Sequence, residues 1–127
     1  MAAGTRAILA AVAAQALTPD LALEYLDQLS TDIRASVVLG ADGSAAAASL
    51  PGADGDRLAA LAGELFERAA DADDQAVTQV EVATGDGAVY AARDDKHVIA
   101  VVAGRFALPS LMFFDLRKVL EDLGKAA

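Results

Sequence analysis

The residues of this chain that could do chemistry are few, and none of them stands in a catalytic pattern. Nucleophilic catalysis requires a Ser, Thr or Cys beside a base. The chain has no cysteine and one histidine, His97, which begins an apolar stretch where a solvent-facing turn residue is the usual explanation. Ser44 does not stand in a Gly-x-Ser-x-Gly elbow. The sequence therefore predicts no catalytic residue.

Two short motifs contain residue types found in phosphate-binding sites, and one acidic stretch contains residue types found in metal sites. A phosphate-binding loop has the pattern Gly-x-x-x-x-Gly-Lys-Ser/Thr, but the Gly124-Lys125 pair is followed by Ala126. The stretch Gly40-Ala41-Asp42-Gly43 could form an anion nest, although its flanking strands favour a hairpin turn. The acidic stretch 71–74 lacks the Gly and the distal Glu of a calcium loop. We therefore expect no metal and no cofactor.

Charge and hydropathy limit the kind of partner. The 127 residues correspond to one domain, and their formal charge is −9. Nucleic acids and anionic membrane surfaces require clustered Lys and Arg, so neither is an expected partner. The apolar stretch Ala7–Ala14 is too short to cross a bilayer, so we expect no stable membrane insertion. These features favour a neutral or basic protein surface as the partner, and we expect a cytoplasmic protein.

An alanine-rich extension, residues 1–17, precedes the expected domain. Its composition allows a helix from Thr5 to Leu17 with a thin apolar stripe. Arg6, the apolar stretch and Ala14-Gln15-Ala16 loosely imitate a secretory signal. Alanine makes that stretch only weakly apolar, so a helical extension is the favoured interpretation.

Two helices are expected to flank the domain. Thr18 and Pro19 have the residue types of an N-cap and a first helical position, and the helix that they begin is expected to end near Asp32. The last helix is expected to begin near Pro109 and to stop at Gly124.

A further helix, from Asp54 or Asp56 to about Ala70, has two neighbouring rows of apolar residues. One row is rich in leucine and the other in small residues: Leu58, Leu61, Leu65 and Ala69 in the first, and Ala62, Gly63, Phe66 and Ala70 in the second. We expect the first row to cover a sheet and the second to admit another helix, such as the same helix of a second subunit.

The strand pattern predicts an antiparallel sheet. Val37–Leu39 and Val98–Ala103 lack polar alternation, which is typical of central strands covered on both faces. Asp42-Gly43 after the first of them predicts a two-residue hairpin turn. Val77–Thr84 alternates and suits an edge, and Ala88–Arg93 continues a meander. The order helix, hairpin, helix, meander, helix therefore predicts one α+β domain over residues 18–124.

This ordered set of elements resembles the Roadblock/dynein light chain family of small longin-like dimeric domains. The resemblance covers Leu21 to Leu123. It rests on a helix that ends in Leu-x-x-Leu, the hairpin Ser-Val-Val-Leu-Gly-Ala-Asp-Gly-Ser, the leucine-rich second helix, the meander and a final Leu-Arg-x-x-Leu-x-x-Leu helix. It implies a five-stranded antiparallel sheet of order 2-1-5-4-3, with the second helix on one face and the first and last helices on the other.

The resemblance also implies a homodimer and a GTPase partner. Family members pair the edge strand and pack the two second helices, which here predicts an interface at Leu58, Ala62, Phe66, Ala70, Val80 and Val82. They scaffold or regulate small Ras-like GTPases, often through the paired helices, so the charged residues of this helix, Arg57, Glu64 and Arg68, are candidate partner contacts. Surface ion pairing along the helix explains the same charges, and this alternative stays open.

A second class of function is compatible with the same order of elements. Profilin-like and PAS-like ligand sensors also wrap helices around an antiparallel sheet, but they require an internal pocket into which polar groups converge. The inner positions of this chain are small and aliphatic, which counts against such a pocket. We therefore expect a non-enzymatic module that binds a Ras-like GTPase, with a small-ligand sensor as the alternative.

Overall fold

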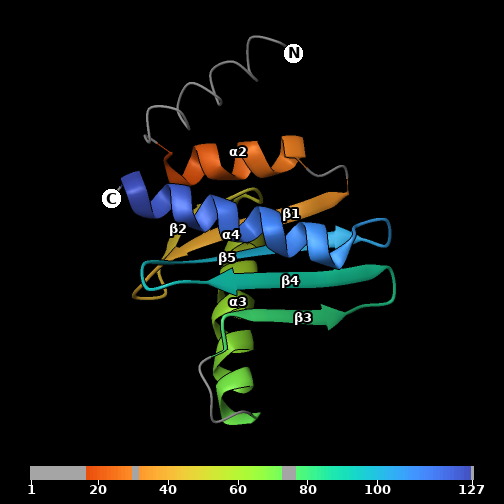
Figure 1. Ribbon diagram of the computed structural model, residues 1–127. Helices are drawn as coiled ribbons and strands as arrows, with labels where there is room; N and C mark the ends of the chain where they lie inside the picture. Colours follow the sequence, from red (N-terminus) through yellow and green to blue (C-terminus); the bar gives the residue numbers. More distant parts are fainter. Residues whose placement is uncertain (1–16, 30–31, 73–76, 127) are drawn as a thin grey trace.

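The computed structural model contains a five-stranded antiparallel sheet with helices on both faces (Figure 1). It describes residues 17–29, 32–72 and 77–126, so the predicted extension lies outside these ranges except for Leu17. The elements in order are α2 (Pro19–Leu29), β1 (Ile33–Gly40), β2 (Ala45–Ala48), α3 (Gly52–Ala72), β3 (Gln79–Ala83), β4 (Gly87–Arg93), β5 (His97–Gly104) and α4 (Pro109–Ala126). The strand order is β2-β1-β5-β4-β3, which confirms the predicted α+β class and sheet order.

The two most apolar strands form the centre of the sheet, as their sequences predicted. β1 and β5 are antiparallel neighbours, with Val37 opposite Ala100 and Val38 opposite Ile99. All four of these side chains are fully buried. Strands covered on both faces have no solvent side, so they show no polar alternation.

Each face of the sheet has its own apolar core. On one face, α2 and α4 pack against Val38, Ile99 and Val101. On the other, α3 packs against Val37, Leu39 and Ala100. Figure 1 shows α2 and α4 together on one side and α3 alone behind the sheet. This distribution of helices is the one that the resemblance implied.

The start of α2 is as predicted, and its end is earlier. The Thr18 Oγ1 accepts a hydrogen bond from the Leu21 N–H at 3.3 Å, which is the expected N-cap contact. The predicted end near Asp32 is wrong, because α2 ends at Leu29. Asp32 instead ties the start of β1 to the end of β5: its carbonyl accepts from the Gly104 N–H and its carboxylate from the Phe106 N–H.

Three further boundaries differ from the sequence prediction. The predicted helix start at Asp54 or Asp56 is wrong, because α3 begins at Gly52 and Asp54 lies in its first turn. The β1–β2 loop spans the four residues 41–44 rather than two, and Gly43 has a positive φ of 86°. α4 passes through Gly124 to Ala126, since Gly124 does not have the positive φ of a helix-ending glycine.

Candidate functional site

The outer edge of β3 has no strand beside it among the described residues. Thr78 and Thr84, which flank β3, direct backbone groups towards β4: the Thr78 carbonyl accepts from Arg93, and the Thr84 N–H donates to Gly87. Backbone groups alternate sides along an extended strand, so those of Gln79, Glu81 and Ala83 point away from the sheet. This edge is therefore available for pairing with another strand.

Apolar surface lies next to this edge. Val80 packs against the core beneath α3, and Val82, on the same face of the strand, is 39% exposed. α3 crosses the sheet and extends beyond β3 (Figure 1). An open strand edge, an uncovered valine and an overhanging helix thus lie together.

Three of the six predicted interface residues are buried within the chain itself. Leu58, Ala62 and Phe66 are 6%, 0% and 3% exposed, and all three belong to the core between α3 and the sheet. The Arg93 guanidinium lies 4.7 Å from the centre of the Phe66 ring, in a cation–π contact. These side chains therefore hold α3 on its own sheet. Of the others, Ala70 and Val82 are exposed and Val80 is half-buried.

The two flanks of α3 have different surroundings. Gly63 and Ala70 line a shallow hollow of about 280 Å³ beside the β1–β2 loop. Helical geometry places Leu61 and Leu65 on the opposite flank. Leu61 is 39% exposed and Leu65 is half-buried. Leu61 was expected to face the sheet, and it is instead an apolar side chain on the outer surface of the overhanging helix.

The charged residues of α3 form ion pairs with their helical neighbours. Arg57 Nη1 lies 3.3 Å from Asp54 Oδ1, and Arg68 Nη2 lies 3.0 Å from Glu64 Oε1. All four side chains are more than half exposed. Exposed pairs of this kind contribute about 0.3–0.5 kcal/mol each. A partner could therefore recruit Arg57, Glu64 and Arg68 at little cost to the fold.

An apolar patch on the opposite face of the sheet was not anticipated from the sequence. Four large side chains around the start of α4 are highly exposed: Phe106 at 77%, Leu108 at 61%, Leu111 at 57% and Phe114 at 62%. Together with Leu29 and Asp115, three of them line a hollow of about 340 Å³. Exposed patches of this type are typical of contact surfaces. The sequence did contain a signal for this patch, because Leu111 and Phe114 are apolar although they lie outside the inner face expected for the last helix.

Asp115 in this patch gives a pH-dependent prediction. Partial burial raises the pKa of its carboxyl above the ordinary value. A carboxyl with a raised folded-state pKa stabilises the fold below its unfolded-state pKa, and this contribution is lost as the pH rises through the folded-state pKa. We therefore expect Asp115→Asn to unfold at a higher temperature than the wild type at pH 7, with the difference shrinking below about pH 4. Thermal unfolding at both pH values, with exposed Asp95→Asn as the control, measures this. A difference of equal size at both pH values would contradict it.

His97 begins β5 as expected, but the prediction that it faces solvent is wrong, because the residue is half-buried and its Nδ1 is buried without a hydrogen-bond partner among the described residues. Its backbone N–H donates to Asp94 Oδ1 at 2.9 Å, and its carbonyl accepts from the Asp94 N–H at 3.0 Å.

Within the described residues, no three His, Cys, Asp or Glu side chains are grouped so that they could hold a metal ion. The helices of the described ranges include none that is long and apolar enough to span a membrane.

Known structures with a similar fold come from several groups of proteins. A Roadblock/LC7 domain from Streptomyces avermitilis superposes with a TM-score of 0.73 at 23% identity, over 80% of this chain and 90% of that one. MglB from Myxococcus xanthus gives 0.64 at 13% identity, over 80% and 87% of the two chains. LokiProfilin2, from its complex with rabbit actin, gives 0.58 at 14% identity, over 82% and 93%.

Sequence comparison alone identifies no relative. No protein-family model matches the chain, and no curated protein matches its sequence. The likeness is therefore one of architecture, and it extends over most of the chain and most of each similar structure. The strand order, the distribution of the helices and these superpositions show that the chain has the Roadblock/LC7 fold.

Proposed function

We propose that this protein is a non-enzymatic, homodimeric module that binds a small Ras-like GTPase in the cytoplasm. The observation that carries the proposal is the open β3 edge beside the overhanging α3. The Roadblock family, which the sequence resembles, dimerises through these two elements and serves small GTPases as scaffold or regulator. The fold itself is compatible with this role.

The dimer has a two-fold axis beside β3. Each β3 pairs with its copy through the outward groups of Gln79, Glu81 and Ala83. The overhanging part of each α3 then covers Val82 of the partner, whose side chain is 39% exposed in the single chain. Leu61 contributes apolar surface where the two copies of α3 meet. Leu58, Ala62 and Phe66 take part indirectly, because they fix α3 on its sheet.

The GTPase contacts the solvent side of the paired helices. Arg57 and Arg68 are the cations of this surface, and Glu64 lies between them on the helix. Charged residues at the rim of an interface mainly set the association rate and the choice of partner. The ion pairs that they form in the single chain are weak enough to be exchanged for contacts with a partner.

Capture of the GTPase from cell extract tests the proposal. Immobilised protein is incubated with extract that is nucleotide-free or contains GDP or a GTP analogue, and the bound proteins are identified by mass spectrometry. We expect a Ras-like GTPase to be recovered. Arg57→Glu with Arg68→Glu should reduce its recovery about tenfold, whereas exposed Arg117→Glu on α4 should not. Failure to recover any GTPase under all three conditions would refute the GTPase assignment.

A further inference from the structure

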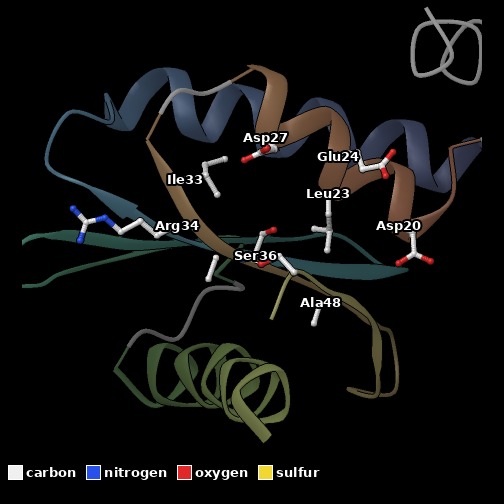
Figure 2. A pocket seen from close by; sticks show the side chains of 10 residues that line it. Asp20, Leu23, Glu24, Asp27, Ile33, Arg34, Ser36 and Ala48 are labelled. Atoms are coloured by element: carbon white, nitrogen blue, oxygen red, sulfur yellow. Dashed lines mark hydrogen bonds between the residues drawn. The ribbon is translucent and has the colours of Figure 1, made fainter. Parts of the chain in front are cut away.

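A groove lies between α2 and the beginning of β1 (Figure 2), far from the β3 edge. Its volume is about 440 Å³. One wall is α2, which presents Asp20, Glu24 and Asp27 along one side. The other wall consists of residues 33–36 of β1 and 48–49 at the end of β2. The proposed dimer and GTPase surfaces use neither wall.

The strand wall of this groove is an open edge. β2 pairs with β1 only from Val37 to Leu39. Ser49 extends the pairing by one residue, since its N–H donates to the Ser36 carbonyl and its Oγ accepts from the Ser36 N–H at 2.8 Å. Before that point no strand of the described chain lies beside residues 33–35 on this side, although β5 pairs with Ile33 and Ala35 on the other, with a shift of register between them. An extended segment can therefore continue the sheet where β2 stops.

The helical wall carries a row of separated negative charges. Asp20, Glu24 and Asp27 are all exposed, and none of them takes part in the ion pairs among the described residues. Their positions along the helix axis differ by about 6 and 4.5 Å. Since no metal-holding group of three such side chains is present in the described residues, these carboxylates do not converge on one ion. They form a row that suits several cationic groups in succession, and the cation of the groove lining, Arg34, points away from them in Figure 2.

A buried hydroxyl lies at the base of the groove. Ser36 is 3% exposed, and it is on the same face of β1 as Val38, which packs against α2. Its side chain lies on the α2 side of the strand in Figure 2. Ser36 thus contributes a hydroxyl to the lining of the groove.

We propose that this groove binds an extended, basic segment of a partner protein, which adds to the open edge of β1 as a strand. Alternate side chains of an extended strand point the same way and are about 6.6 Å apart, close to the spacing of the carboxylates. Lys or Arg at alternate positions therefore meets Asp20, Glu24 and Asp27 in turn. Leu23 and Ile33 cover the stems of these side chains, and Ser36 accepts a hydrogen bond from one of them.

A defined peptide tests this proposal. The probe is fluorescein-labelled Lys-Thr-Lys-Thr-Lys-Thr-Lys, and its binding to the full chain is followed by fluorescence anisotropy at low salt. Glu24→Lys with Asp27→Lys is expected to raise the Kd about tenfold. The control, Glu67→Lys with Glu121→Lys, changes the net charge equally at exposed positions outside the groove, and it should change the Kd less than about twofold.

A second measurement identifies strand addition. Titration with the unlabelled probe should shift the backbone amide NMR signals of residues 33–36. It should also increase the protection from hydrogen exchange within residues 33–35, whereas the Ser36 N–H already donates to Ser49. The block peptide Lys-Lys-Lys-Lys-Thr-Thr-Thr has the same charge and should bind about fivefold more weakly, because its cations do not match the spacing of the groove. Three results would each overturn the proposal. They are an equal loss of affinity in the groove and control variants, unshifted amide signals at residues 33–36, and no binding of the probe to the wild type.

Discussion

Phe66→Ala is expected to lower the free energy of unfolding by about 3–5 kcal/mol. Phe66 is 3% exposed and lies in the core between α3 and the sheet. Its loss leaves a cavity in that core and removes the ring on which the Arg93 guanidinium stacks at 4.7 Å. Urea unfolding followed by circular dichroism measures the change.

Phe114→Ala is the matched control, because it removes the same ring from a position that is 62% exposed. We expect its free energy of unfolding to stay within about 0.5 kcal/mol of the wild type. If Phe66→Ala instead unfolded at the wild-type urea concentration but lost its dimeric mass, Phe66 would act between subunits, as the sequence had suggested.

The fold was predictable because several independent patterns agree. Val37–Leu39 and Val98–Ala103 are apolar on both faces, and the structure places them side by side in the centre of the sheet. Val77–Thr84 alternates, and β3 is an edge strand. Helix ends were less predictable, because they depend on tertiary contacts. The helical spacing of apolar residues continues to Ile33, but the backbone and side chain of Asp32 bind Gly104 at the end of β5 and Phe106 just after it.

The surface of α3 was harder to predict than its presence. Its two apolar rows lie about 100° apart around the helix, so composition alone does not determine which of them faces the sheet. The structure turns Ala62 and Phe66 inwards and leaves Leu61 partly exposed. A large leucine is usually expected inside and a small alanine outside. Here the two are reversed, because the close approach of α3 to the sheet requires a small residue at the contact.

The groove beside α2 could not be found from sequence periodicity. Asp20, Glu24 and Asp27 appear in the sequence as the solvated side of an amphipathic helix. The groove exists because β2 is shorter than β1 and leaves the start of β1 uncovered. The length of β2 and the four-residue loop at 41–44 together determine how much of β1 is covered. An unpaired strand edge is a property of the register, which no single segment of the sequence determines.

Leu61→Glu is expected to convert the proposed dimer into a monomer without unfolding it. Leu61 is 39% exposed in the single chain, so the substitution leaves the core beneath α3 intact. At the dimer interface it would bury carboxylates without partners, which should weaken association about a hundredfold or more. Sedimentation equilibrium over a range of concentrations measures the dissociation constant, and circular dichroism verifies the fold.

Two further variants separate a specific effect from a general loss of apolar surface. Leu111→Glu makes the same change at a leucine that is 57% exposed on the other face of the sheet, and it should remain dimeric. Glu81→Pro removes an N–H that points away from β4, so it should weaken pairing between copies of β3 while the bonds between β3 and β4 persist. A wild-type chain that stays monomeric at every concentration, or a Leu61→Glu variant with an unchanged dissociation constant, would exclude this interface. If Leu61→Glu dissociates and Leu111→Glu does not, the contact lies on the α3 face, because the same charge placed on the other side of the sheet leaves the dimer intact.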